Sequence, residues 1–107
     1  MYIKIIAGIG YDSMGDMLSE SRINNAIDDT LARLSDEFGG ATLTYGKGAW
    51  IDGGGQLVKE DCVIFESYTE RAMPHTAANT IAQLLRIDLR QTSVVLAIDG
   101  KHEFITN

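Results

Sequence analysis

The sequence is poor in the residues that build disulfides, metal clusters and linkers. Its one cysteine, Cys62, cannot form an internal disulfide, and one cysteine with two histidines cannot build a metal cluster without carboxylates. The single proline, Pro74, and the lack of low-complexity segments leave no sign of a linker. We therefore expect one domain over residues 1–107, with its own core, no metal and no cofactor.

Positive charge is also scarce. Nine Lys and Arg against fifteen Asp and Glu give a net charge of −6, which argues against nucleic acid and against an anionic membrane surface as partners. No apolar run approaches the roughly 18 residues of a membrane-spanning helix. Because Lys4 interrupts the first apolar run, we expect no secretory signal. A single cysteine, Cys62, is typical of proteins in a reducing compartment. The expected location is the cytoplasm.

Two segments have helical periodicity. Residues 21–38 place apolar side chains at helical spacing, with Ser19 or Ser21 available as a cap and Gly39 as a stop. Residues 75–88 repeat the pattern directly after Pro74, which is tolerated at the start of a helix.

The other apolar segments favour strands. Residues 2–9, 41–51, 57–68 and 92–98 are extended in character, and Asp99-Gly100 predicts a tight turn into a short strand over 101–106. Gly46 and Gly48 indicate a bulge or a close approach within the second strand. Residues 10–20 are predicted to form a long polar loop.

The order β-α-β-β-α-β with an extra strand predicts an α+β fold of the ferredoxin-like, split βαβ type. Its antiparallel sheet would carry both helices on one face. The strands nevertheless offer apolar residues to both faces, as Ile5 and Ile6 do side by side. We therefore expect the second face to be covered, by sheet-to-sheet packing of a second copy in a homodimer or by a small apolar ligand.

Short motifs give a family resemblance. They are Gly8-x-Gly10, Leu18-Ser19-Glu20, Gly40-x-Thr42-x-x-x-Gly46-x-Gly48-x-Trp50, Gly55-Gln56-Leu57-Val58-Lys59-Glu60, Cys62-Val63-Ile64-Phe65-Glu66, with Glu60 and Glu66 as E-x-x-x-x-x-E, and Gln91-x-x-Val94. The pattern resembles a small bacterial family known as a domain of unknown function. Its members often carry a secretory or lipoprotein leader that is missing here. The resemblance implies a ferredoxin-like fold and no chemistry.

Two familiar glycine motifs do not apply. Gly8-x-Gly10 lacks the third glycine of a dinucleotide-binding turn, because Ser13 occupies that position. Gly40 and Gly46-Lys47 have the wrong spacing for a phosphate loop, and Gly48 replaces the required Ser or Thr.

Five residues are candidates for binding a ligand or partner: Tyr11, Trp50, Cys62, Ile64 and Tyr68. Tyr11 lies in the long polar loop, whose carboxylates match no calcium-loop spacing. Trp50 is either an interface hot spot or a cap on the core edge. Cys62 is typical of a small buried hydrophobe, and it shares a strand face with Ile64.

Glu66 and His75 are the candidate catalytic residues. By alternation Glu66 shares the second sheet face with Cys62 and Ile64, where a covering layer would desolvate it and suit it to proton transfer, with Tyr68 nearby. The alternative is a solvated or salt-bridged residue at the strand end. His75 begins a helix, where a neutral imidazole is favoured, and a capping or surface role is the alternative.

Two functions follow from these patterns. The first is a homo-oligomeric binding or interaction module, favoured by the doubly apolar sheet and the lack of a catalytic constellation. The alternative is a small cofactor-free enzyme of the dimeric α/β-barrel type, using Glu66 on the second face for proton transfer.

Overall fold

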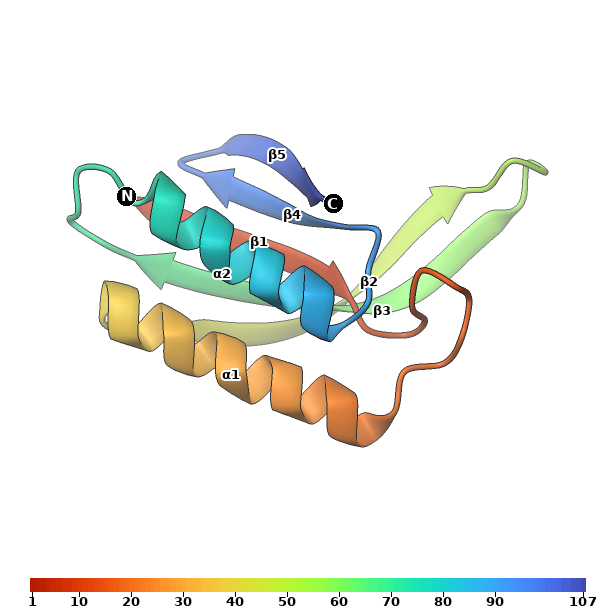
Figure 1. The fold of residues 1–107 in the computed structure, drawn as a ribbon. Coiled ribbons are helices and arrows are strands. Elements are labelled where there is room, and N and C mark those ends of the chain that lie inside the picture. Colours follow the sequence, from red (N-terminus) through yellow and green to blue (C-terminus); the bar gives the residue numbers. More distant parts are fainter.

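A computed structural model describes residues 1–107. The elements follow the order β1 (Tyr2–Gly8), α1 (Glu20–Phe38), β2 (Thr42–Ile51), β3 (Leu57–Tyr68), α2 (His75–Asp88), β4 (Ser93–Ile98) and β5 (Lys101–Thr106). One sheet contains all five strands in the order β2-β3-β1-β4-β5, and every neighbouring pair is antiparallel. Both helices cover the same face of this sheet (Figure 1). The ferredoxin-like prediction is confirmed.

The two helices begin and end where local chemistry dictates. The Ser19 hydroxyl accepts a hydrogen bond from the Arg22 amide at 3.1 Å, so Ser19 and not Ser21 caps α1. Gly39 ends α1 with a left-handed φ of 91°, a conformation that glycine adopts at little cost. Helix α2 starts after Pro74, which offers no side-chain cap.

The core lies between the helices and one face of the sheet. Phe65 and Ile5, which are register partners on β3 and β1, are both fully buried there. Leu34 of α1 and Leu85 of α2 close over them and are 1% and 0% exposed. This layer removes these four apolar side chains from water, and such burial is the main favourable contribution to folding.

The connections also follow the sequence. Asp99 and Gly100 have φ values of 49° and 84°, so both central residues of the β4–β5 turn have the positive φ that was predicted. Strand β2 pairs with β3 without interruption from Thr42 to Ile51, so Gly46 does not mark a bulge. A Cβ on Gly46 would lie 3.4 Å from the Cys62 sulfur, and one on Gly48 would lie 3.8 Å from the Glu60 carbonyl oxygen. Both are ordinary van der Waals distances, so these glycines do not mark a close approach of another backbone.

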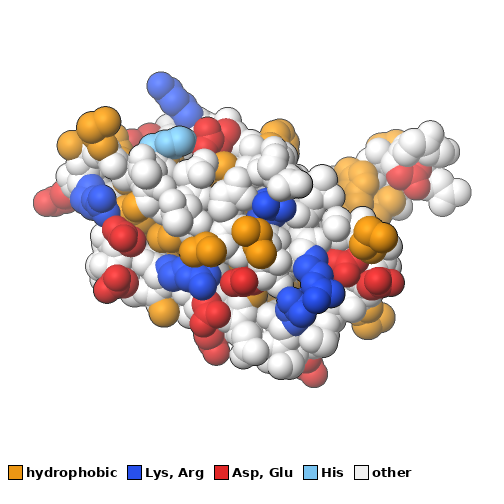
Figure 2. Space-filling model, in the orientation of Figure 1, with side chains coloured by type: hydrophobic (Ala, Val, Ile, Leu, Met, Phe, Trp, Pro, Cys, Tyr) orange, Lys and Arg blue, Asp and Glu red, His pale blue; other side chains and the backbone are white.

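The distal halves of β2 and β3 form an arm, residues 47–61, that projects beyond the body of the molecule (Figures 1 and 2). An ion pair between Lys47 and Asp61 lies at its base. Trp50, Ile51 and Leu57 are about half exposed or more along it. The arm is a two-stranded ribbon with no third strand beside it.

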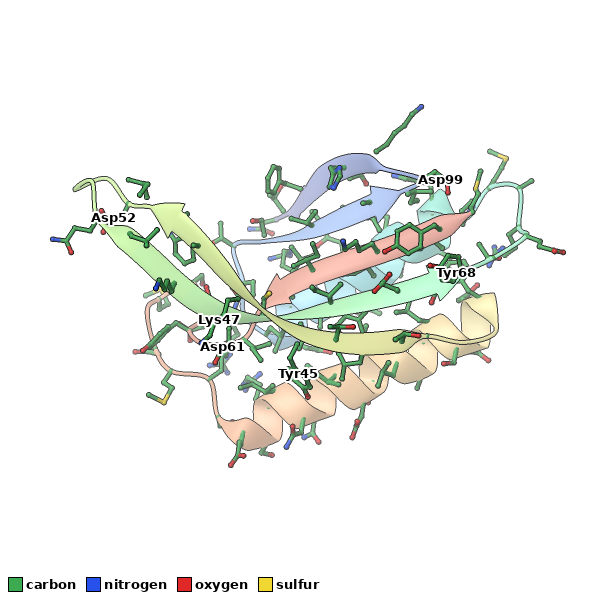
Figure 3. The ribbon with its side chains drawn as sticks, turned by 180° about the vertical axis from the view of Figure 1, so that it is seen from behind. Tyr45, Lys47, Asp52, Asp61, Tyr68 and Asp99 are labelled. Atoms are coloured by element: carbon green, nitrogen blue, oxygen red, sulfur yellow. The ribbon has the colours of Figure 1, made fainter.

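The face of the sheet opposite the helices has no second layer (Figure 3). An apolar row crosses it from Ile64 through Ile6 and Val95 to Phe104, which is 73% exposed. The next row places Lys4 beside Glu66. The sequence therefore predicted correctly that apolar residues occupy both faces.

Neither of the two helices combines the length and the apolar character that crossing a membrane requires.

Candidate functional site

A pocket of about 490 Å³ lies where β1 ends, between the base of the arm, the loop after β1 and the segment before β4. Tyr11 and Trp50 contribute aromatic rings to its lining, and Glu60 and Lys59 contribute charges. The remaining lining residues are small or polar: Gly8, Asp12, Ser13, Gly15, Val58, Gln91, Thr92 and Ser93. Its volume lies in the range, roughly 300–1,000 Å³, that small-molecule sites occupy.

Glu60 lies across the end of β1. Its Oε1 accepts a hydrogen bond from the Gly10 amide at 3.3 Å, and the Tyr11 amide lies 3.5 Å away. A Cβ on Gly8 would lie 2.4 Å from that oxygen, and one on Gly10 would lie 3.2 Å from Glu60 Cγ. The two glycines of the Gly8-x-Gly10 motif therefore leave space for the Glu60 carboxylate. In a nucleotide-binding turn, glycines leave the same kind of space for a phosphate.

Hydrogen bonds hold the loop that forms one wall of the pocket. The Asp12 carboxylate accepts from the amides of Met14 and Asp16, both at 2.9 Å. Gln91 donates to the Tyr11 carbonyl at 2.8 Å and so ties the loop to the segment before β4. The Asp12 carboxylate thus stabilises the loop. No group of three or more His, Cys, Asp or Glu side chains is placed to hold a metal ion.

The predicted binding residues fall into separate places. Tyr11 and Trp50, chosen for different reasons, line the same pocket. Cys62 and Ile64 follow Glu60 along the open face of β3, and Cys62 is 8% exposed. Burial, together with the nearby charges of Glu60 and Asp61, raises the pKa of the Cys62 thiol. Cys62 is therefore a packed residue and a poor nucleophile.

Glu66 and Tyr68 occupy the other end of the open face, with Tyr2 between them and β4. The Tyr2 hydroxyl donates to the Glu66 carboxylate, and the Tyr2 and Tyr68 rings stack with centroids 5.0 Å apart. The hydrogen bond to Glu66, then burial, then the negative charge raise the pKa of Tyr2 to about 12. Glu66 thus has a polar partner but lines only a hollow of about 280 Å³ at the end of α1.

His75 does not join Glu66. It begins α2 on the helix-covered side, and its Nε2 lies 2.8 Å from Glu103 Oε1 of β5. Glu66 is on the opposite face of the sheet. The two candidate catalytic residues therefore belong to different surfaces, because the split βαβ connection places the start of α2 across the sheet from the end of β3.

Glu60 is the residue that sequence reasoning missed. The sequence did contain a signal for Glu60, because strand alternation places it on the same face of β3 as Cys62, Ile64 and Glu66. Only the register of β1 against β3, which places Gly8 opposite Cys62, shows that Glu60 reaches over a glycine and into a pocket.

The comparisons with known proteins identify a fold. No family model matches the sequence, and no curated protein matches it. A solved structure of a phage SAM lyase in complex with S-methyl-5'-thioadenosine has a TM-score of 0.72 at 19% identity, covering 99% of this chain and 88% of that one. A phage SAM lyase in the apo state has a TM-score of 0.68 at 22% identity, with the same coverage. At this identity the likeness establishes the shared fold.

The contact between Glu60 and Gly8 gives a first prediction. Gly8→Ala should lower the free energy of unfolding by about 1 kcal/mol, because the new methyl group displaces Glu60 from its amide donor. In a Glu60→Ala background the same change should cost less than about 0.5 kcal/mol. Urea unfolding of the four proteins measures the coupling.

Gly40→Ala is the matched control for this cycle, because no atom lies within 4 Å of the added carbon and the φ of Gly40 is not positive. It should cost the same in either background. Equal costs of Gly8→Ala with and without Glu60 would show that the carboxylate does not occupy this position.

The pKa of Tyr2 gives a second prediction. Absorbance at 295 nm should show that Tyr2 is still protonated near pH 11, and Glu66→Gln should return its pKa toward 10. The folded state keeps a proton that the unfolded state releases, so stability is complete below about pH 10 and falls as pH rises toward about 12. Complete ionisation of tyrosine by pH 11, in a chain that circular dichroism shows folded, would contradict the pairing.

Proposed function

We propose that the chain is a small cofactor-free enzyme that cleaves SAM, S-adenosylmethionine, at the bond between its sulfonium sulfur and its amino-acid chain. The observation that carries the proposal is the pocket at the end of β1, where Tyr11, Trp50 and the Glu60 carboxylate line one cavity of about 490 Å³. The likeness to SAM lyase over 99% of the chain supports it at the level of fold.

The chemistry of the lining suits each part of this substrate. Tyr11 and Trp50 offer ring faces for the adenine and for the sulfonium, since aromatic rings attract both π systems and cations. Glu60 is placed to accept from the ribose hydroxyls or the ammonium group, and Lys59 to meet the substrate carboxylate. The net charge of −6 favours the approach of a cation.

The reaction needs no redox partner. As the bond between sulfur and the amino-acid chain breaks, the sulfur keeps the electron pair and becomes the neutral thioether of S-methyl-5'-thioadenosine. The substrate's own carboxylate supplies the electron pair for a new carbon–oxygen bond to that carbon, so the amino-acid chain leaves as homoserine lactone. The positive charge on sulfur vanishes during this step. A pocket walled by Trp50 and Val58 hydrates that charge less well than bulk water does, so it favours the transition state over the charged substrate.

In this proposal the active-site carboxylate is Glu60, whereas the sequence analysis assigned that role to Glu66. Glu66 is engaged by Tyr2 on the open face, and its role there is to orient the Tyr2–Tyr68 stack. The reading as a binding module makes a different prediction for the same pocket, namely that SAM binds and is released unchanged.

A third prediction separates these readings. Incubation with SAM should produce S-methyl-5'-thioadenosine, detected by liquid chromatography and mass spectrometry. Glu60→Gln should lower kcat/KM by about 100-fold, as loss of one positioned charge does in other enzymes. Glu66→Gln, with the same chemical change on the same strand, should stay within about threefold.

The opposite order of effects would move the active site to the Glu66 end of the sheet. Saturable binding of SAM without product would identify a binding module. Neither binding nor product would refute the assignment of SAM to this pocket.

We infer that the chain forms a homo-oligomer through the open sheet face. The row Ile64, Ile6, Val95 and Phe104 is the apolar surface that the helices leave uncovered. Lys4 lies beside Glu66, so the two charges next to this apolar row offset one another while the whole chain carries −6. Two acidic copies therefore repel one another least when they meet here. A cytoplasmic location, where SAM and a reduced Cys62 would both be found, belongs to the same proposal.

A fourth prediction tests the interface. Sedimentation equilibrium at tens of micromolar should give a dimer or larger species, and Val95→Lys should give a monomer because it places a charge in the centre of the apolar row. Ile87→Lys is the matched control, since Ile87 is 56% exposed on α2, on the helix-covered side. A monomeric wild type would refute the oligomer.

A further inference from the structure

A second pocket lies at the opposite end of the sheet from the candidate site. The start of the chain, residues 69–74, the start of α2 and the β4–β5 hairpin meet at this end of the molecule (Figure 1). They enclose about 540 Å³, slightly more than the pocket beside Glu60. The proposed reaction uses none of its residues.

The floor of this second pocket is apolar. Leu96 and Ile98 reach it from the helix-facing side of β4, and Leu96 is only 1% exposed. Met1 and Met73 stand at its edge, and Met73 is 85% exposed. Methionine side chains are flexible and polarisable, so a pair of them over an apolar floor adapts to irregular hydrocarbon shapes.

One oxygen of each carboxylate at the rim already has a partner. Asp99 Oδ1 accepts from the Tyr2 amide at 2.7 Å. Glu103 Oε1 lies 2.8 Å from His75 Nε2 and accepts from Asn79 at 3.5 Å.

The two cationic groups at the same rim differ. The Met1 ammonium donates to the Thr69 carbonyl, whereas the side chain of Lys101, which also lines the pocket, forms no ion pair and no hydrogen bond in the structure. His102 likewise has no partner. Lys101 is therefore an unpaired positive side chain at this rim, on a chain with a net charge of −6.

We infer that this pocket binds a small amphipathic monoanion, a carboxylate on a hydrocarbon or aromatic body. The apolar body would cover Leu96 and Ile98 beneath Met73, and the carboxylate would meet Lys101 at the rim. A neutral molecule of the same shape cannot form that ion pair and should bind more weakly. A more highly charged anion is repelled by Asp99 and Glu103.

Octanoate is the probe, added to the full chain without SAM. Calorimetry should give saturable binding with one site per chain, and 1-octanol should bind about tenfold more weakly. Lys101→Glu should weaken octanoate about tenfold, since it replaces an attraction with a repulsion. Met73→Glu should do the same at an exposed position that leaves the core intact. Lys47→Glu makes the same charge reversal on the distant arm and should stay within about twofold.

Methyl resonances locate the bound probe. Those of Met73 and Ile98 should shift on titration, and those of Ile6 and Val95 on the open face should not. Absence of saturable binding, equal weakening by Lys101→Glu and Lys47→Glu, or shifts confined to the open face would each overturn the inference. Because the assay contains no nucleoside, its failure would leave the proposed SAM cleavage unaffected, and failure of that proposal would leave this site standing.

Discussion

The antiparallel register of β1 against β3 is the constraint on which the rest of the structure depends. It places Ile5 opposite Phe65 beneath the helices and so defines the core. It also places Gly8 opposite Cys62, which brings Glu60, two residues before Cys62, across the end of β1. A slip of one residue would reverse every side chain of the strand, so the core and the candidate site are specified together.

One sheet therefore carries two surfaces with different roles. The face under the helices holds the large buried side chains and gives the chain its stability. The open face combines an apolar row with the Tyr2–Glu66 pair, and nothing in the chain covers it. An antiparallel sheet tolerates this asymmetry because its strands alternate. The cost is an exposed apolar surface, which a second copy of the chain would remove from water in the proposed oligomer.

The two ends of the sheet differ in the chemistry that they offer. At the end of β1, Tyr11, Trp50 and Glu60 line the pocket to which the proposed function assigns a cationic nucleoside. At the other end, an apolar floor beside an unpaired Lys101 suits an anion with an apolar body. A chain with an excess of acidic residues thus presents two local environments for which we propose opposite preferences, because Lys101 is unpaired at one end and Glu60 lines the pocket at the other.

The sequence by itself determined the elements. Apolar periodicity, the Ser19 cap, the Gly39 stop and the Asp99–Gly100 turn are local signals, and each predicted its helix or strand within about two residues. Trp50 and Tyr11, which the sequence offered as binding candidates for separate reasons, line the same pocket, although no pattern joined them. Tertiary structure alone decided that Glu60 reaches the pocket, that Glu66 pairs with Tyr2 and that His75 lies across the sheet from Glu66. Those contacts join residues from 28 to 64 positions apart, and strand register and chain connection, not local propensity, bring such residues together.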